Sequence, residues 1–158
     1  MFVLEVVEAL DKYKVKYALI GAYALAFHGI VRATMDVDIA ISLTSQELKN
    51  TEKALQSINL TSRLPLNAKE LAMFRKDYIK KRNLIAWSFI DFKDRSRGVD
   101  VLLTDSLKKF SVEQFIFKKN QITVLSLKDL LYLKQKSKRL KDQLDVQSIE
   151  ELLNEKKD

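Results

Sequence analysis

Apolar and polar positions near the start of the chain follow first a helical and then a strand-like spacing. One helical face of the first segment carries Phe2, Val3, Val6, Val7 and Leu10. This spacing predicts an amphipathic helix. The apolar run 17–20 predicts a short buried strand that ends at Gly21, and residues 22–28 predict a helix that Gly29 stops.

Residues 32–42 alternate between polar and apolar positions. Arg32, Thr34, Asp36 and Asp38 fall on one parity, and the odd-numbered positions between 33 and 41 are all apolar. Because successive side chains of a strand point to opposite faces, this pattern predicts a strand with one polar face.

Helical and strand patterns continue along the rest of the chain. Helices are expected over 44–58, 68–82, 127–140 and 142–153, and strands over 84–92, 99–104 and 122–125. Residues 93–98 join two of these strands as a hairpin connection with Gly98 at its end, whereas residues 107–118 fit no single element. We therefore expect one α/β domain over 1–158, with a core of about 1–105 and a helical C-terminal part of about 106–158.

Composition narrows the chemistry that this domain can perform. The 158 residues include no cysteine and one histidine, which excludes disulfides, a thiolate nucleophile and cysteine-bound zinc. Carboxylates, hydroxyls, lysines, arginines or an oxygen-bound metal remain. The uncharged run 17–31 is too short to cross a bilayer, and the N-terminus has no basic segment of a secretory signal. We expect a cytoplasmic protein with no membrane partner.

Basic residues outnumber acidic ones mainly in the second half of the chain. The formal net charge is +7, and residues 80–158 hold 18 basic and 12 acidic side chains. An asymmetric basic surface suits an anionic partner such as a nucleotide or RNA. A solvated lysine-rich surface explains the same numbers.

Asp36 and Asp38 carry the first candidate chemistry. Two residues apart on a strand, their carboxylates project from the same side. Adjacent like charges on a half-buried strand repel each other, so the pair is more natural as ligands of a hard divalent cation. Acids on an exposed strand face are the alternative interpretation.

A third carboxylate, Asp100, lies among strand-forming residues further along the chain. If its strand neighbours that of Asp36 and Asp38, the three carboxylates can meet and hold two magnesium ions about 3.5–4 Å apart, as in phosphoryl transfer. An ion pair with Arg95 or Arg97 at the sheet edge is the alternative role for Asp100. Asp91, also on a predicted strand, is its rival as the third carboxylate.

Gly21 stands where a strand turns into a helix. The first N–H groups of a helix have no internal partner and attract phosphate, and glycine lets a ligand approach the backbone closely. A packing role is the alternative.

These motifs, in this order, resemble the nucleotidyltransferase superfamily, whose members have a palm like that of DNA polymerase β. Gly21-Ala22 resembles the glycine turn of that family, Asp36-Val37-Asp38 its paired acids and Asp100 its third acid. Two longer segments, 29–38 and 129–145, resemble the small group related to AbiEii toxins.

The resemblance implies a small mixed sheet flanked by helices, with C-terminal helices, and a set of site residues. Asp36, Asp38 and Asp100 would bind magnesium, with manganese as the alternative ion. The implied nucleotide-binding residues are Gly21, Ala22, Arg32, Thr34, Lys134 and Arg139. Of these, Gly21 and Ala22 would contact the β- and γ-phosphates through their amides. Arg32 would bind phosphate or neutralise the paired acids.

The function expected from the resemblance is metal-dependent transfer of a nucleoside monophosphate from a nucleoside triphosphate to a hydroxyl of RNA, such as tRNA, or of a protein. The alternative is a catalytically weak binding module, such as a toxin–antitoxin component with an antitoxin-type partner. Ala22 motivates the alternative, because the family usually has serine or glycine at that position.

Three further features are interpreted more simply. His28 ends an apolar helix without a partner histidine and is expected to be structural. The expected core aromatics are Phe74, Tyr78, Trp87, Phe110, Phe115 and Phe117. The basic stretch 75–82 is either a guide for an RNA backbone or a solvated helix face.

Overall fold

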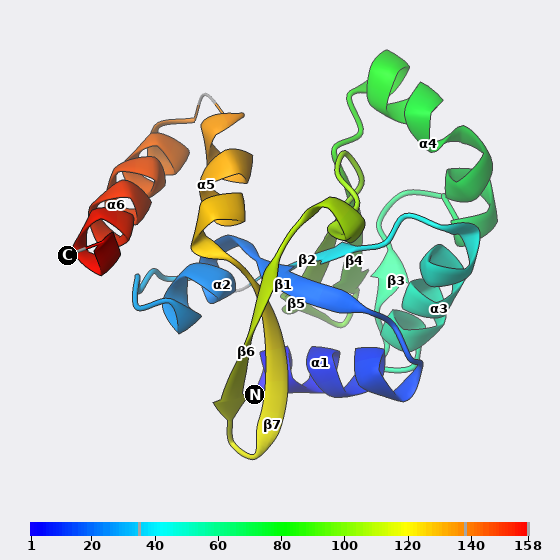
Figure 1. Ribbon diagram of the computed structural model, residues 1–158. Helices are drawn as coiled ribbons and strands as arrows, with labels where there is room; N and C mark the ends of the chain where they lie inside the picture. Colours follow the sequence, from blue (N-terminus) through cyan, green and yellow to red (C-terminus); the bar gives the residue numbers. More distant parts are fainter. Residues whose placement is uncertain (35, 138, 158) are drawn as a thin grey trace.

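The centre of the computed structural model is a seven-stranded mixed sheet with the order β3-β4-β5-β2-β1-β7-β6 (Figure 1). Its strands are β1 (Tyr17–Ile20), β2 (Val37–Ile41), β3 (Thr61–Ser62), β4 (Ala86–Asp91), β5 (Asp94–Leu102), β6 (Val112–Phe117) and β7 (Asn120–Leu125). The structure describes residues 1–34, 36–137 and 139–157. Met35, within one predicted strand, Lys138, within the predicted helix 127–140, and Asp158, the end of the predicted domain, lie outside the described residues.

Strand direction changes within the sheet. β2 runs parallel to β5 and β1 parallel to β7, whereas β1 and β2 are antiparallel. The hairpins β4–β5 and β6–β7 extend the sheet on its two sides. The expected α/β architecture with a mixed sheet is confirmed.

Six α-helices and one short 3-10 helix are described around the sheet. They are α1 (Phe2–Lys12), α2 (Gly21–Phe27), α3 (Ser45–Gln56), α4 (Ala68–Arg82), η1 (Leu107–Lys109), α5 (Leu127–Gln135) and α6 (Leu140–Lys157). α1 packs against α3, and α5 packs against α6 and contacts α2. None of these helices combines the length and the apolar character needed to cross a bilayer.

Helix starts follow the sequence closely because polar side chains cap them. The Thr44 side chain accepts a hydrogen bond from the backbone N–H of Glu47 at the start of α3. The Asn67 side chain accepts one from the N–H of Glu70 at the start of α4. Such caps satisfy N–H groups that the helix itself leaves without a partner.

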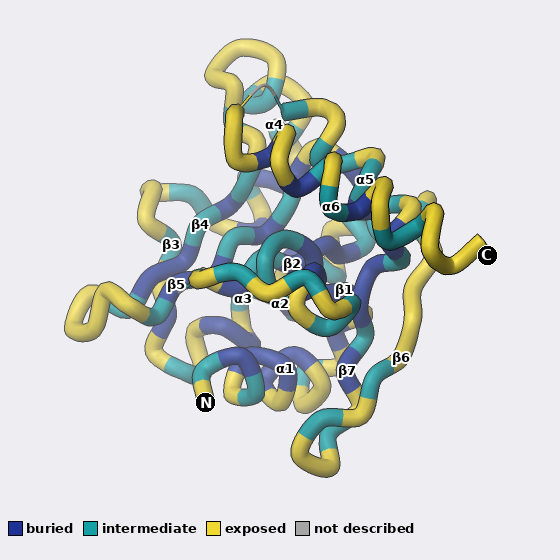
Figure 2. Tube along the Cα trace, turned by 90° about the vertical axis from the view of Figure 1, so that its left-hand side faces the viewer, coloured by how far each residue is buried: buried dark blue, intermediate teal, exposed yellow. Residues whose placement is uncertain are grey.

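The core fills the space between the helices and the sheet. Large side chains with almost no exposure include Leu10, Leu19, Ile39, Trp87 and Phe89. Figure 2 shows the buried trace concentrated in the sheet and α1, while the loops and the outer turns of α4 and α6 are exposed. Burial of this apolar surface is the main contribution to stability.

The predicted strand 32–42 is too long at its start. β2 begins at Val37, where its ladder with β5 begins, and its ladder with β1 begins one residue later at Asp38. The described residues before Val37 pair with no strand, so alternation alone did not make them a strand.

The hairpin between β4 and β5 has a shorter turn than predicted. Only Phe92 and Lys93 form the turn, and β5 begins at Asp94. Gly98 therefore lies inside β5, opposite Ile90, rather than at the end of a loop. A register shift beside Asp91 accommodates the charged residues that had suggested a loop.

The chain after residue 105 is less helical than predicted. The segment 107–118 forms η1 and β6, and β6 and β7 make a hairpin that joins the sheet through β1. The predicted helix 127–140 ends at Gln135, and α6 begins at Leu140. The sheet thus crosses the expected boundary between the core and the C-terminal part.

Candidate active site

Two of the three candidate carboxylates lie side by side at the centre of the sheet. β2 and β5 are neighbours, and their register places Asp38 opposite Asp100. On the other side of β2, Asp38 is opposite Ile20, the last residue of β1. The adjacency on which the sequence argument depended is therefore present.

Gly21 makes room for Asp38. The glycine has φ +66°, and a Cβ at this position would come within 2.9 Å of the Asp38 Cγ atom. Rotation of the carboxylate would not relieve the overlap, because the Asp38 Cβ atom would also be only 3.0 Å away. The packing role considered for Gly21 is thus present, since the strand-to-helix turn fits directly against the candidate carboxylate.

Gly98 does the same for Asp36. A Cβ on Gly98 would lie 2.7 Å from Asp36 Oδ1. Asp36 therefore leans toward β5, whereas Asp38 leans toward the start of α2. Within the ranges that the structure describes, no three Asp, Glu, His or Cys side chains gather closely enough to hold a metal ion as they stand.

The negative charges of these carboxylates nevertheless influence one another. Burial, together with the nearby charges of Asp100 and Asp36, raises the pKa of Asp38 to about 7, while Lys134 and Lys141 oppose the shift. A carboxyl with this pKa carries its negative charge at a high cost at neutral pH.

Ser88 fixes the orientation of Asp100. Its hydroxyl donates a hydrogen bond of 2.5 Å to Asp100 Oδ1 across the β4–β5 ladder. The sequence reasoning missed Ser88, although its position in the hairpin was a usable signal.

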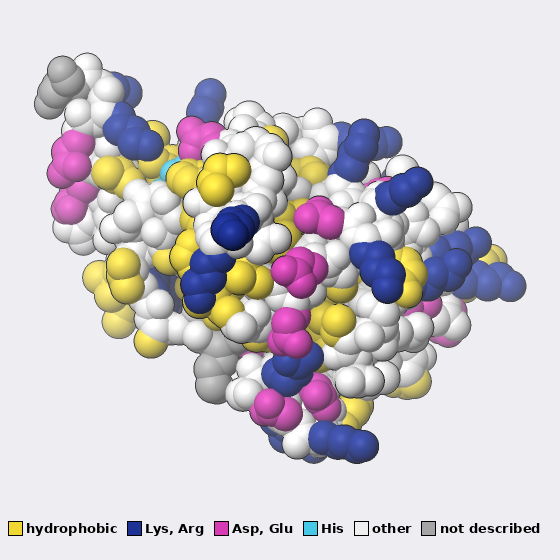
Figure 3. Space-filling model, turned by 90° about the horizontal axis from the view of Figure 1, so that it is seen from below, with side chains coloured by type: hydrophobic (Ala, Val, Ile, Leu, Met, Phe, Trp, Pro, Cys, Tyr) yellow, Lys and Arg dark blue, Asp and Glu magenta, His cyan; other side chains and the backbone are white. Residues whose placement is uncertain are grey.

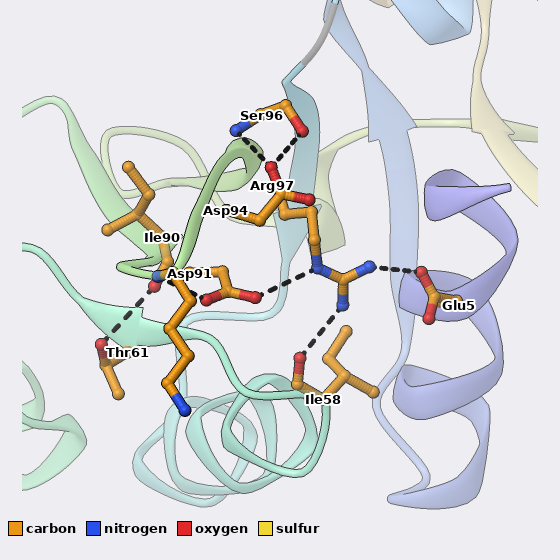
Figure 4. A network of polar contacts seen from close by, with 9 residues as sticks. Glu5, Ile58, Thr61, Ile90, Asp91, Asp94, Ser96 and Arg97 are labelled. Atoms are coloured by element: carbon orange, nitrogen blue, oxygen red, sulfur yellow. Dashed lines mark hydrogen bonds and ion pairs between the residues drawn. The ribbon is translucent and has the colours of Figure 1, made fainter.

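The proposed ion pair of Asp100 with Arg95 or Arg97 is not formed. Arg97 contacts Glu5, Asp91 and the carbonyl oxygen of Ile58 (Figure 4). Arg95 lies over the ring of a phenylalanine instead.

Asp91, the rival third carboxylate, belongs to the same Arg97 network. Its Oδ2 lies 3.4 Å from Arg97 Nε, and its Oδ1 accepts the N–H of Lys93 in the hairpin turn. Asp100 instead faces Asp38. The geometry therefore favours Asp100 over Asp91.

A cleft of about 640 Å³ opens over the paired carboxylates. Its lining includes Asp38 and Asp100, next to Gly21, and apolar residues of β5 and α5. Lys134 and Arg139 line it as well, both paired with Asp142, and we call this part the basic side of the cleft. A cavity of this size whose lining holds both carboxylates and cations suits a small polyanion bound together with a cation.

The basic side of the cleft is held by buried carboxylates of α6. Lys134 Nζ lies 2.9 Å from Asp142 Oδ1 and 3.1 Å from Asp145 Oδ2, and Arg139 Nε lies 2.8 Å from Asp142 Oδ2. Asp142 and Asp145 are both buried. Both lie in the segment 129–145 that resembles the AbiEii-related group, but they were not predicted as site residues.

Arg32 does not neutralise the paired acids, and its binding of phosphate stays a prediction. It precedes β2, and its Nη1 forms an ion pair with Asp145 instead of Asp36 or Asp38. Thr34 donates to the backbone oxygen of Asp36. Neither Arg32 nor Thr34 lines the cleft, and Ala22 and Asp36 are also not among its lining residues.

A second cationic cluster borders the cleft. Lys109 and Lys136 both form ion pairs with the buried Asp105, and both ammonium groups lie within 5 Å of the Tyr132 ring centroid. Asp105 and Lys136 line the cleft. No sequence pattern pointed to this cluster, because its members come from separate elements.

His28 is structural, as expected. Its Nε2 lies 2.9 Å from the carbonyl oxygen of Leu125, and the ring packs edge-on against Phe115. The aromatic predictions are confirmed for Trp87, which is buried, and are wrong for Phe74, which is 44% exposed. The remaining aromatics, which pack partly buried against the core, are Tyr78, Phe110, Phe115 and Phe117.

Comparison of the fold identifies its relatives in shape. The lincosamide antibiotic adenylyltransferase LnuA, solved with lincomycin bound, aligns with a TM-score of 0.61 over 95% of both chains at 11% identity. A Thermotoga maritima protein classified provisionally as a nucleotidyltransferase aligns with a TM-score of 0.58 at 16% identity, over 97% of this chain and 91% of that one. A nucleotidyltransferase-like antigen of Paracoccidioides brasiliensis gives 0.57 at 15%, over 96% and 74%.

These similarities establish the fold that the chain shares with nucleotidyltransferases. By sequence, no family model and no curated protein matches the chain. The narrower resemblance to the AbiEii-related group stays a prediction.

Proposed function

We propose that the protein is a metal-dependent nucleotidyltransferase, which transfers a nucleoside monophosphate from a nucleoside triphosphate to a hydroxyl group. The observation that carries this proposal is the pair Asp38 and Asp100, side by side in a cleft that Lys134 and Arg139 also line. The shared fold supports the same reaction class.

The donor set is chemically suited to a divalent cation. Carboxylate oxygens are the ligands that magnesium prefers, and the raised pKa of Asp38 reflects burial and crowded charge that a cation would relieve. Asp36 leans toward Gly98, so its participation requires its side chain to turn. When bound, magnesium or manganese would neutralise charge on the triphosphate and on the departing pyrophosphate.

The residues of the chain perform the remaining steps of the proposed reaction. The acceptor oxygen forms a bond to the α-phosphorus while the bond to the bridging oxygen breaks, and pyrophosphate leaves with that electron pair. Asp100, oriented by Ser88, helps to remove the proton of the acceptor hydroxyl. Lys134 and Arg139 bind the nucleotide from the basic side.

The turn at the start of α2 completes the proposed nucleotide site. The backbone amides of Gly21 and Ala22 contact the β- and γ-phosphates in this proposal. Gly21 lines the cleft, and it keeps the turn directly against Asp38. RNA or protein is the proposed source of the acceptor hydroxyl, and an antitoxin-type protein is a proposed partner.

A catalytically weak binding module is the second candidate. Lys134 already contacts two buried carboxylates, so a triphosphate has to compete with Asp142 and Asp145 for it. Ala22 also lacks the hydroxyl that serine would offer to a phosphate. Both features favour weaker nucleotide binding.

A transfer assay separates these candidates. The protein is incubated with each triphosphate labelled at the α-phosphate, magnesium or manganese, and total RNA or lysate protein. We expect label transfer that falls at least about a hundredfold in Asp38→Asn and Asp100→Asn. Mutation of a residue that only hydrogen-bonds to a metal ligand already lowers activity about 10- to 100-fold, and loss of a ligand itself should cost more.

Asp91→Asn is the matched control. It removes a carboxylate of the same hairpin that pairs with Arg97, and it should retain most of the activity. Equal losses in Asp91→Asn and Asp100→Asn would contradict the assigned site. No transfer with any triphosphate and either metal would leave the binding module as the better description.

A further inference from the structure

Helix α4 projects from the sheet as a basic arm. Only Ala68 and Leu71, both in its first turn, are buried. Its basic side chains are Lys69, Arg75, Lys76, Lys80, Lys81 and Arg82, against the acidic Glu70 and Asp77. Beyond that first turn, Tyr78 and Ile79 pack partly buried against the core, and most of the other side chains are exposed. The core alone does not explain this exposed part of the helix.

One side of α4 carries an aromatic and cationic ladder. Phe74, Tyr78 and Arg82 are spaced four residues apart, so they stack along one face. The ring centroids of Phe74 and Tyr78 are 6.3 Å apart, and the Arg82 guanidinium lies 5.9 Å from the Tyr78 centroid. Phe74 is 44% exposed, although aromatic side chains are usually buried.

The ladder borders a shallow hollow of about 280 Å³. Its lining, which we call the α4 platform, consists of Phe74, Asp77, Tyr78, Lys81 and Arg82. Planar groups therefore lie beside one lysine and one carboxylate. Nucleobases stack on such aromatic and guanidinium faces, and basic side chains hold the adjoining phosphates.

The α4 platform lies close along the chain to the candidate active site. After Arg82 the chain turns at Asn83, which has φ +53°, and Ile85 lines the cleft together with Asp100. Ile85 is 51% exposed. Figure 1 shows α4 and α5 extending beyond the same end of the sheet.

Charge on the opposite side of the molecule is mixed. Viewed from the side on which α1 lies, acidic and basic side chains are interspersed (Figure 3). The excess of basic side chains on α4 is thus not repeated on this face.

We infer that the α4 platform binds the single-stranded end of a polynucleotide, whose terminal hydroxyl is the acceptor in the transfer reaction. This inference rests on the proposed function for the acceptor role but not for the binding itself. Asp77 favours bases over phosphates within the hollow, because a carboxylate repels phosphate and accepts hydrogen bonds from base amino groups. An acidic peptide would be repelled by Asp77 and would make no use of the ladder.

Binding is measured by fluorescence anisotropy with labelled oligonucleotides of about 12 nucleotides, the size that one single-strand site covers. RNA and DNA single strands and a duplex of the same length are compared. We expect single strands to bind more tightly than the duplex. Phe74→Ala should weaken binding about tenfold, since one stacking contact is lost.

Met73→Ala and Lys76→Ala are the matched controls. Both residues are exposed neighbours on α4 that do not line the hollow. Met73→Ala should change the dissociation constant by less than about twofold. Lys81→Ala should reduce the salt dependence of binding more than Lys76→Ala does. Thermal melts check that Phe74→Ala folds like the wild type.

The outcomes separate this inference from the proposed function. Asp38→Asn and Asp100→Asn should keep oligonucleotide binding while transfer is lost. Binding and labelling of RNA alone would identify RNA as the source, and equal use of DNA would identify any single strand. Equal binding of the duplex, equal effects of Phe74→Ala and Met73→Ala, or transfer only to protein would overturn the inference.

Discussion

Gly21 shows how a single hydrogen atom shapes the candidate site. Gly21 has a positive φ and lies directly against Asp38. A residue with a Cβ would be strained at this φ and would also overlap Asp38. Gly29 also has a positive φ, but nothing lies within 4 Å of a Cβ at that position. The two glycines therefore share a positive φ but differ in the space around them.

This difference gives a prediction for Gly21→Ala and Gly29→Ala. Both variants should unfold more easily by about 1–3 kcal/mol, because alanine is strained at a positive φ. Only Gly21→Ala should also displace Asp38 and lower transfer per folded molecule. Urea unfolding followed by the transfer assay measures the two effects.

A double-mutant cycle tests the assigned contact. Combining Gly21→Ala with Asp38→Ala should recover part of the lost stability, because the overlapping carboxyl group is removed. Gly29→Ala combined with Asp38→Ala should be additive. Additivity in both cycles would show that Gly21 and Asp38 do not contact each other as described.

Ion pairs between elements hold α5 and α6 together. Asp142 is only 1% exposed, and burial opposes its ionisation. Hydrogen bonds from Ser137, Lys134 and Arg139 outweigh burial and hold the pKa of Asp142 well below its usual range. A buried acid with such partners stabilises the folded state only while it is charged.

The pH dependence of Asp142→Asn follows from that sign. The folded-state pKa is lower than the unfolded one, so the contribution of Asp142 is complete at neutral pH and is lost as the pH falls below about 4. Near pH 7 the variant should be less stable than the wild type by about 2–3 kcal/mol. This loss is smaller than for most broken buried ion pairs, because the Arg139 side chain stays largely solvated.

Denaturant unfolding from pH 7 to pH 2 measures this prediction. The gap between wild type and Asp142→Asn should narrow as the pH falls, since the wild-type carboxyl becomes neutral as well. Glu150→Gln is the control, because Glu150 is an exposed acid of the same helix. A gap of constant size down to pH 2 would contradict the role assigned to the Asp142 charge.

Elements with a strong local pattern were predictable from the sequence. Apolar spacing predicted α1, helical patterns predicted α3 and α4, and the alternation around Asp38 predicted β2 except for its start. Gly98 was placed wrongly because the charged residues before it resemble a loop, whereas cross-strand pairing with β4 makes them a strand. Local composition carries no record of such pairing.

The site was predictable only in part for a related reason. Strand patterning identified Asp38 and Asp100, but the register that sets them opposite each other is a tertiary property. The Arg32–Asp145 ion pair joins residues that are far apart in the chain, so parity on a presumed strand assigned Arg32 to the wrong partner. No sequence signal led to the cluster of Lys109 and Lys136 around Asp105.

At the scale of the whole molecule, the proposed metal site predicts a ligand-dependent stability. A cation that binds only the folded state stabilises it by about 1.4 kcal/mol at ten times its dissociation constant. For a domain of this size the unfolding midpoint should rise by about 3–5 °C. Thermal melts with increasing magnesium measure the shift without any nucleotide.

The same melts identify the ligands. Asp38→Asn and Asp100→Asn should abolish the magnesium-dependent rise, and Asp91→Asn should retain it. A rise of equal size in all four proteins would point to a cation bound elsewhere on the surface. Potassium chloride at the same ionic strength controls for general screening of charge.

The strand β7 places a segment from the second half of the chain beside β1. β1 lies between β2 and β7, and Leu19 in β1 pairs with Val124 in β7. On the ribosome, β7 emerges well after β1. One edge of β1 therefore stays open during synthesis, when it can pair wrongly with other chains. We expect the nascent protein to depend on chaperones until β7 arrives, more than its finished fold suggests.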